Sequence, residues 1–260
     1  MKKIDYHTHT YFSADSTAKP EEHILKAIQE GLEEICFTDH HDCLDGWRLN
    51  CEAYFEELLP LKEKYKDQIK VKIGIEIGID MDGFEESNTL ASKYPFDFVI
   101  GSIHTIHLQD ITQDSYYGTT SKDEAHKNYF LTMKECVEKM DGYDVLGHLD
   151  YARRYGPYED KTINYEKHQH IIDDIYRTLI SKGKGIEVNI SGIRRFGVSL
   201  PGYNQIKRYY DLGGRIITIG TDSHDSEFVG VHVDEVMNML KEIGFTEVTT
   251  YTQRKRDIHQ

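Results

Sequence analysis

The sequence alternates between short β-branched runs and longer segments of helical period, about eight times from end to end. Such alternation predicts parallel strands joined by helices that pack outside the sheet. The runs predicted as strands are residues 3–6, 34–38, 70–77, 96–102, 145–149, 185–190, 215–220 and 247–251. Because seven or eight such units follow one another without a linker rich in proline and serine, a closed barrel is favoured over an open sheet. We therefore expect residues 1–260 to form one domain.

Helices are predicted between these strands, at residues 20–30, 50–65, 84–92, 122–140, 165–182, 203–212 and 227–243. Pro20 stands in the first turn of its helix, where its missing N–H costs nothing, and Gly31 ends that helix. Pro60 predicts a break or a kink in the second helix. Residues 109–120 and 151–162, rich in Tyr, Gly, Asp and Arg, are long enough to act as lids or substrate loops.

Composition limits the possible partners of this chain. The formal net charge of −14 argues against a nucleic-acid groove, which needs clustered lysine and arginine. No apolar run approaches the roughly 18 residues that a membrane span needs, and charged residues crowd the N-terminus where a signal peptide would be apolar. We therefore expect a cytoplasmic protein. The four cysteines form no CxxC pair and are expected to be free thiols.

Ionisable side chains follow nearly every predicted strand at the point where it ends. Because the carboxyl ends of all strands in a βα barrel converge on one face, we expect these side chains to share one pocket. The candidates are His7, His9, His40, Glu76, His104, His148, Asp222 and His224. Two pairs among them repeat an i, i+2 spacing, which places both side chains on the same face of an extended chain.

Each candidate alone also has an ordinary structural interpretation. A single His104 or His148 is more often a hydrogen-bonded core histidine, and a pair such as His7 and His9 is more often part of a solvated rim. Glu76 is harder to explain, because it stands within an apolar run and a buried carboxylate needs a partner or loses its charge. Side chains that can bind metal recur at six strand ends, and this recurrence makes a metal site the better interpretation.

Eight candidate ligands are too many for one ion, so the sequence predicts two or three, with Glu76 or Asp222 placed to bridge them. The donors are nitrogen and oxygen without thiolate, which favours zinc, manganese or iron. Closely spaced ions suit hydrolysis of a phosphate ester, because they generate hydroxide from water and stabilise the leaving oxygen.

The ordered motifs resemble those of the polymerase and histidinol phosphatase (PHP) superfamily. The segments that carry the resemblance are His7-x-His9, Thr38-Asp39-His40, the glycine-flanked Glu76, Ser102-Ile103-His104, Gly147-His148 and Thr221-Asp222-x-His224. Within the superfamily, residues 12–16 and 189–195 make the chain similar to the stand-alone phosphatases that convert L-histidinol phosphate to L-histidinol in histidine biosynthesis. The resemblance implies a distorted (β/α)7 TIM-like barrel, the PHP fold, with a trinuclear metal centre.

The resemblance also implies a role for each candidate ligand. His7, His9, Glu76 and Asp222 would hold a first ion; Glu76, His104 and His148 a second; and His40, His224 and a residue of the loop after the first strand a third. Many relatives have a histidine in that loop, whereas this chain offers Asp15. The family pattern favours His40 over its neighbour His41. A hydroxide bridging the first two ions would attack phosphorus, and Glu76, Asp222 and His224 form the expected catalytic set.

Arginines suit bidentate contact with the phosphate of a small-molecule substrate. Two pairs follow the fifth and sixth strands, Arg153-Arg154 and Arg194-Arg195, and we expect Arg154 and Arg195 to be the contacting members. Another PHP phosphoesterase, acting on phosphotyrosine or a nucleotide, and a metal-binding module without turnover remain the alternatives. The oligomeric state stays open.

Overall fold

Seven parallel strands form a nearly closed barrel in the computed structural model, which describes residues 1–257 and, at positions 84, 87 and 88, the backbone alone. Each strand lies next to the strand that precedes it in the chain. The strands in spatial order are β1 (Ile4–Thr8), β2 (Glu34–Phe37), β4 (Lys70–Gly78), β5 (Phe98–Ser102), β8 (Val145–Leu146), β9 (Gly185–Asn189) and β10 (Ile217–Gly220). The predicted distorted (β/α)7 barrel is thereby confirmed.

The barrel closes between its last and first strands through the loop that follows β10. The Asp222 amide donates to the carbonyl of His7 (2.8 Å), and the His9 amide donates to the carbonyl of Ser223 (2.8 Å). The short strand β3 (His40–His41) pairs with the end of β4 and so extends the position of β2. These bonds lie at the carboxyl ends of the strands, where the candidate ligands stand.

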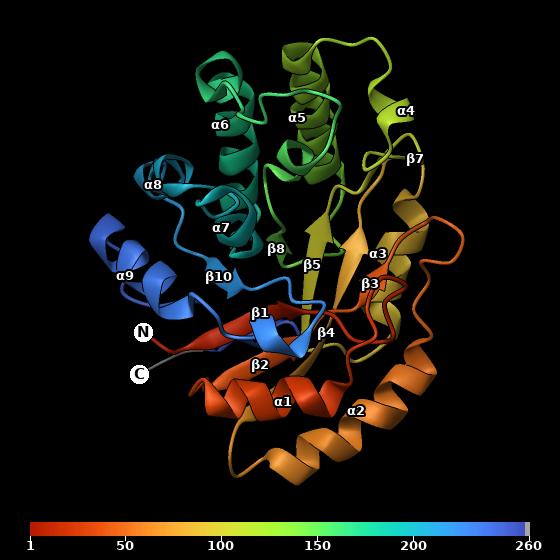
Figure 1. Cartoon of the computed structure of the whole chain (residues 1–260), viewed down its shortest axis with the longest axis vertical. Coiled ribbons are helices and arrows are strands. Elements are labelled where there is room, and N and C mark those ends of the chain that lie inside the picture. Colours follow the sequence, from red (N-terminus) through yellow and green to blue (C-terminus); the bar gives the residue numbers. More distant parts are fainter. Residues whose placement is uncertain (258–260) are drawn as a thin grey trace.

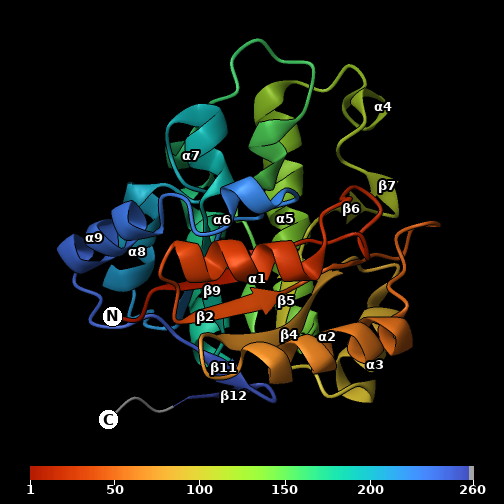
Figure 2. The same cartoon turned by 60° about the horizontal axis from the view of Figure 1, so that its bottom comes forward.

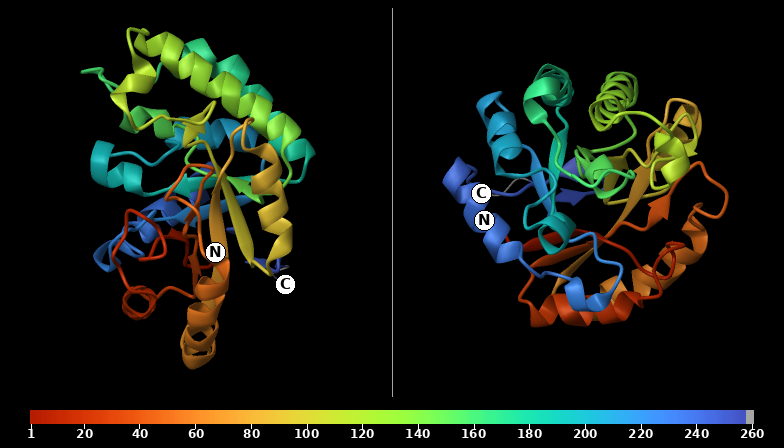
Figure 3. Two further views of the ribbon diagram at one scale, coloured as in Figure 1. Left: turned by 90° about the vertical axis from the view of Figure 1, so that its right-hand side faces the viewer. Right: turned by 45° about the horizontal axis from the view of Figure 1, so that its top comes forward.

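Helices surround the barrel, as the right-hand view of Figure 3 shows. In chain order they are α1 (Pro20–Gln29), α2 (Cys51–Tyr65), α3 (Phe84–Lys93), α4 (Asp114–Tyr117), α5 (Lys122–Lys139), α6 (Tyr165–Ser181), α7 (Ser191–Phe196), α8 (Tyr203–Asp211) and α9 (Val233–Ile243), with 3₁₀ turns at Tyr151–Arg154 and Ser226–Phe228. Figure 1 places α1 and α2 on the side of the barrel opposite to α5 and α6. Within residues 1–257 no helix is both long and apolar enough to span a bilayer.

Three local predictions are wrong. Residues 247–250 form no strand, and β11 (Tyr251–Thr252) pairs instead with β12 (Lys255–Arg256) in an antiparallel hairpin. The reason is that β10 already meets β1, so an eighth strand finds no edge. Of the break or kink predicted at Pro60, the break is wrong, because α2 runs through that residue. The last helix begins at Val233 rather than 227, after a 3₁₀ turn and a left-handed glycine, Gly230 (φ 74°).

One face of strand β4 carries a charged side chain at each mouth of the barrel. Side chains alternate along a strand, so Lys72 and Glu76 point the same way, while Ile73 and Ile75 between them point the other way, and all four are buried. Glu76 stands at the carboxyl end among the candidate ligands. Lys72 stands near the amino end and donates to Thr252 Oγ1 (2.6 Å). The interior of the barrel is therefore polar at both mouths.

The β11–β12 hairpin covers the amino-terminal mouth. Figure 2 shows it at the end of the strands that lies away from α4 and α7. The Tyr251 amide donates to the Tyr6 hydroxyl (3.2 Å), and the Gln253 amide donates to Asp97 Oδ1 (3.2 Å). The C-terminal segment thus adds hydrogen bonds to polar groups that the barrel already pairs, since the Tyr6 hydroxyl donates to Glu34 (2.7 Å) and Asp97 accepts from Lys62 (2.7 Å).

A buried histidine outside the candidate site predicts a loss of stability in acid. His126 of α5 is 2% exposed, and burial, with His168 nearby, lowers its pKa to about 4. The folded state therefore binds fewer protons than the unfolded state, so stability present above pH ~6.5 is lost as the pH falls toward 4. Between pH 7 and pH 5.5 we expect the unfolding free energy of His126→Gln to fall by about 1 kcal/mol less than that of wild type, measured by urea denaturation. The control His170→Gln, at an exposed position of α6, should keep the wild-type dependence, and equal slopes in all three proteins would contradict the assignment.

Candidate metal centre

Glu76 stands at the centre of the carboxyl-terminal mouth, with three imidazoles around one of its carboxylate oxygens. Its Oε2 lies 3.0 Å from His40 Nδ1, 3.1 Å from His7 Nε2 and 3.5 Å from His9 Nε2. His40 reaches it because β3 pairs with β4 in a register that sets His40 opposite Glu76. His41, the next residue, instead accepts a hydrogen bond from the Leu49 amide through Nδ1 (3.1 Å). The structure therefore brings His40, and not His41, into the group.

The other carboxylate oxygen of Glu76 faces two further imidazoles. Oε1 lies 3.0 Å from His148 Nε2 and 3.4 Å from His104 Nε2, and these two nitrogens are 3.4 Å apart. The Ser102 hydroxyl donates to the same oxygen (2.5 Å) and fixes the carboxylate. Because its two oxygens face different histidines, Glu76 could serve as a ligand in both groups, with His7 and His9 and with His104 and His148.

These side chains fit divalent ions on two counts. Ligand atoms about 2.1 Å from one tetrahedral ion lie about 3.4 Å from each other, close to the separations around Glu76. His7 Nε2, His9 Nε2 and Glu76 Oε2 are also buried without a hydrogen-bond partner among the described residues. Buried polar atoms are almost always satisfied, so atoms that converge and lack partners indicate a ligand between them. In one such group of three, His7, His9 and Glu76, all ligand atoms lie within 4.8 Å of one another.

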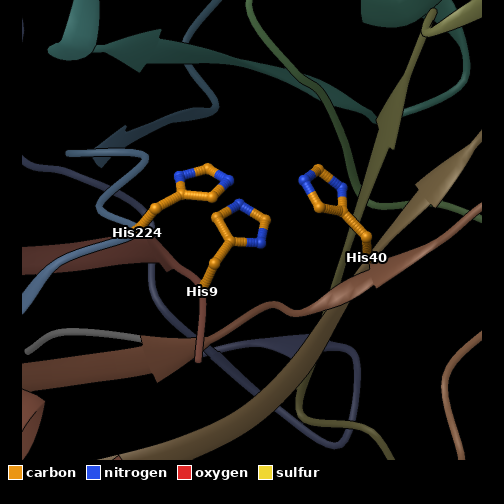
Figure 4. Close-up of side chains that lie close together, drawn as sticks. All are labelled: His9, His40 and His224. Carbon is orange, nitrogen blue, oxygen red and sulfur yellow. The ribbon is translucent and has the colours of Figure 1, made fainter. Parts of the chain in front are cut away.

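A third group lies at the edge of the mouth. The ligand atoms of His9, His40 and His224 all lie within 4.8 Å of one another, and Figure 4 shows the three imidazoles side by side. Asp15 Oδ2 lies 3.0 Å from His224 Nε2 and 3.8 Å from His40 Nε2. His9 belongs to both this group and the Glu76 group, so it stands between two candidate ion positions.

Asp222 joins the Glu76 group from the opposite end of the chain. Its Oδ1 lies 3.4 Å from His9 Nε2 and 3.7 Å from His7 Nε2, and its Oδ2 accepts from Arg154 (2.7 Å). The residue has a left-handed backbone (φ 53°), which aspartate tolerates better than most residues but which still costs energy. A strained residue held in place by a buried arginine is typical of a functional site.

The protonation states favour metal binding at some positions and oppose it at others. Burial would raise the pKa of Glu76, but His7, His104 and His40 outweigh it and hold that pKa well below its usual range, so Glu76 is a carboxylate. Burial, with His40 and His224 nearby, lowers the pKa of His9 well below its usual range, which leaves it neutral as a ligand must be. At His7 the carboxylates of Glu187, Glu76 and Asp222 overcome the opposing effect of burial and raise the pKa. Ion binding must therefore displace a proton there.

Two carboxylates that the sequence analysis missed orient the histidines from behind. Glu187 of β9 accepts a hydrogen bond from His7 Nδ1 (2.5 Å), and Asp42 accepts one from His104 Nδ1 (3.1 Å). Such partners fix the tautomer and the ring orientation of a ligating histidine. A feature of the sequence could have pointed to each of these two carboxylates. Glu187 is a charge within an apolar strand, as Glu76 is, and Asp42 repeats the i, i+2 spacing from His40.

Removing the charge behind His7 is expected to weaken metal binding. We expect Glu187→Gln to keep the side-chain shape, to hold metal about 10-fold more weakly and to lower turnover, as loss of an outer-shell partner usually does. The measurement is metal release against a chelator series, followed by elemental analysis. Glu242→Gln, an exposed position on α9, is the control. Equal metal affinity in the two variants would remove Glu187 from this role.

The ligand groups open into a cavity of about 440 Å³ whose wall carries arginines. Arg154, Arg194 and Arg195 line it. Arg153 does not: its guanidinium stacks on the Phe196 ring at 5.0 Å. Of the first pair only Arg154 lines the cavity, whereas both members of the second pair do. Which arginines contact the phosphate stays a prediction. Arg194 stacks on Phe228 (4.4 Å) and keeps a buried nitrogen without a hydrogen-bond partner in the described part of the chain.

Comparison with known proteins identifies the family. The model of the PHP domain matches residues 5–191. The chain belongs to the PHP family. Within it, the chain is 39% identical over 261 residues to the histidinol-phosphatase of Lactococcus lactis subsp. lactis (strain IL1403), covering 99% of this chain and 97% of the relative. It is 33% identical to the probable histidinol-phosphatase of Clostridium acetobutylicum, over 92% of each chain.

A solved PHP structure agrees over nearly the whole chain. It is the crystal structure of histidinol phosphate phosphatase from Lactococcus lactis subsp. lactis Il1403 complexed with zinc, L-histidinol and phosphate, with a TM-score of 0.92, 38% identity and 99% of both chains covered. The resemblance to the PHP family is thereby confirmed. The family model stops at residue 191, so it leaves out Asp222 and His224, which the fold nonetheless brings to the same mouth.

Proposed function

We propose that this PHP chain is a metal-dependent phosphomonoesterase that hydrolyses L-histidinol phosphate to L-histidinol and phosphate. The observation that carries the proposal is Glu76, buried with two carboxylate oxygens that face five imidazoles. Its support from outside the chain is the relative of 39% identity named for this activity. A structural neighbour, 38% identical to this chain, is complexed with zinc and with both products of this reaction, L-histidinol and phosphate.

We assign the ligands of two to three ions, zinc, manganese or iron, to three groups. The first comprises His7, His9, Glu76 and Asp222, the second Glu76, His104 and His148, and the third Asp15, His40 and His224. Partial burial would raise the pKa of Asp15, but the hydrogen bond with His224 and the nearby imidazoles lower it to about 2, so its carboxylate is ionised at neutral pH. Such ions, when bound, supply Lewis acidity and lower the pKa of water.

The protein's own residues position the phosphate ester and balance its charge. Arg194 and Arg195 line the cavity, where their guanidinium groups would meet the phosphoryl oxygens. A guanidinium fork suits bidentate contact with phosphate. Arg154 lies deeper and holds Asp222, so it acts chiefly by fixing that carboxylate. Ser102 fixes Glu76 in the same way. Held rigidly, these groups meet the charge that develops on the phosphoryl oxygens without reorganising.

The test is a comparison of substrates with the purified protein. We expect kcat/KM for L-histidinol phosphate to exceed that for phosphotyrosine and for a nucleoside monophosphate by at least about 100-fold, which corresponds to about 2.7 kcal/mol. Turnover should stop when a chelator removes the metal and return when zinc, manganese or iron is restored. A higher kcat/KM for phosphotyrosine or for the nucleotide, or turnover that persists in metal-free protein, would overturn the assignment.

A further inference from the structure

The barrel carries a second large hollow, at the mouth opposite to the candidate metal centre. Its volume is about 700 Å³, and it is lined by segments that precede β8, β9 and β10 and by the C-terminal hairpin. Tyr143 and Asp144 come before β8, Lys184 before β9 and Ile216 before β10. Figure 2 shows the β11–β12 hairpin at this end of the barrel. None of its lining residues lines the cavity at the carboxyl-terminal mouth, which is called the catalytic mouth below.

The lining of this hollow is cationic although the chain is acidic. Six lysine and arginine side chains line it against three carboxylates, in a chain with a formal net charge of −14. The cations are Lys182, Lys184, Arg215, Arg254, Lys255 and Arg256, and the carboxylates are Asp144, Glu247 and Asp257. A concave surface that concentrates one sign of charge raises the local concentration of ions of the opposite sign.

Two of the three carboxylates are already engaged. Asp144 accepts the fork of Arg254, with contacts of 2.9 and 3.2 Å. Asp257 accepts from the hydroxyls of Thr250 and Thr252 (2.9 Å each), and its charge faces Lys72, outside the lining, at 3.6 Å. Lys182 pairs with Asp141 outside the lining (3.0 Å). Within the lining, Glu247 is the carboxylate left to balance Lys184 and the three exposed cations, so the lining keeps excess positive charge.

Three of the cations are exposed and lack carboxylate partners. Within residues 1–257, no carboxylate lies within 4.0 Å of the charged groups of Arg215, Lys255 or Arg256. Arg215 is nevertheless held in place, because it stacks on the Tyr210 ring at 3.8 Å and donates to the carbonyls of Tyr210 (2.8 Å) and Gly214 (2.7 Å) through one nitrogen. Its other guanidinium nitrogens remain available to a ligand, already oriented.

A lysine deeper in the hollow indicates the same unmet charge. Lys184 stacks over the Tyr143 ring at 4.4 Å and donates to the carbonyls of Asp141 (2.9 Å) and Tyr143. Burial lowers its pKa to about 8; Arg254 adds to the effect and Asp144 opposes it. A bound anion would favour the charged form of this lysine, since an opposite charge nearby offsets burial.

We propose that this hollow is a binding site for a small organic anion that carries at least two oxyanion groups. Lys184, Arg215, Lys255 and Arg256 are the cations of the lining that would contact these groups. Its volume is in the range of small-molecule sites, and guanidinium forks match the geometry of phosphate, sulfonate and carboxylate oxygens. The site is separate from the catalytic mouth and does not depend on the proposed phosphatase activity.

The test is calorimetric titration of the metal-loaded full chain with two probes. Benzene-1,3-disulfonate presents two tetrahedral oxyanions that the enzyme cannot hydrolyse, and glutarate presents two carboxylates. We expect saturable binding of at least one probe, one per chain, and the stronger of the two identifies which oxyanion the site prefers. Arg215→Gln/Arg256→Gln should weaken that binding at least 10-fold. Exposed Lys127 and Lys241 lie outside the lining, so Lys127→Gln/Lys241→Gln, which removes the same charge, should not weaken it.

The controls separate this site from the catalytic mouth and from misfolding. Arg195→Gln, at the catalytic mouth, should bind the probes as wild type does, and the double variant should keep wild-type phosphatase turnover and melting temperature. If loss of Arg215 unfolds the chain, Lys255→Glu/Arg256→Glu takes its place, because both side chains are exposed. Absence of saturable binding, equal binding by the double variant, or loss of binding in Arg195→Gln would each overturn the proposal.

Discussion

Replacing Glu76 by alanine is expected to strip metal from the protein and to abolish phosphatase turnover, by at least about 10³-fold in kcat/KM. Glu76 is the only residue whose two oxygens face both the His7–His9–His40 side and the His104–His148 side of the centre in the described chain. Without it, five imidazoles remain in a buried space with no bridging carboxylate. Metal content by elemental analysis and initial rates with L-histidinol phosphate measure the two effects.

A matched pair of variants separates loss of the bridge from loss of folding. Glu76→Gln keeps the volume and the Ser102 hydrogen bond but not the charge, so it should also lose metal while melting cooperatively. Asp257→Asn, at the opposite mouth, should keep both metal and turnover. Full metal content and full activity in Glu76→Ala would contradict the bridging role.

Replacing Arg154 by alanine is expected to lower kcat/KM about 100-fold, which corresponds to about 2.7 kcal/mol. The Arg154 and Asp222 side chains are 6% and 4% exposed and 2.7 Å apart. Removing one member of a buried, hydrogen-bonded charge pair is costly. Without Arg154, Asp222 Oδ2 would keep only the neutral donors Asn189 (3.3 Å) and Ser191 (3.2 Å). Here the partner left behind is a candidate ligand with a left-handed backbone, so its position should relax.

The adjacent arginine is the control for this variant. Arg153 stacks on Phe196 and lies outside the catalytic cavity, so Arg153→Ala should change kcat/KM by less than about fivefold. Steady-state kinetics of both variants with L-histidinol phosphate decide the matter. Similar losses of kcat/KM in the two variants would show that Arg154 has no special role. A larger loss in Arg153→Ala than in Arg154→Ala would assign the functional role to Arg153 instead.

The barrel could be predicted from the sequence because its signal is repeated along the chain. Each strand is a short β-branched run and each helix has its own period, so an error at one position leaves the pattern intact. The run 247–251 was misleading because it satisfies the local criteria for a strand, and only the closure of β10 onto β1 excludes it. Pro60 was misleading in the other direction, since α2 continues through it.

The candidate ligands could be predicted because they stand where hydrophobic strands end. The outer carboxylates could not be assigned in the same way, since Glu187 acquires its role only when β9 comes to lie beside β10 and near β1. Gly220 of β10 makes this approach possible, because a Cβ there would collide with His7 and Glu187. The member of each arginine pair that faces the cavity depends on local backbone direction, which residue type does not encode.

Anomalous diffraction from crystals grown with zinc tests the central claim most directly. We expect at least two zinc peaks about 2.0–2.2 Å from ligand atoms, one between His7, His9 and Glu76 and another between Glu76, His104 and His148. A third peak is expected near His40 and His224. The account would be contradicted if crystals grown with zinc showed no anomalous peak at the carboxyl-terminal mouth, or showed zinc only elsewhere on the chain.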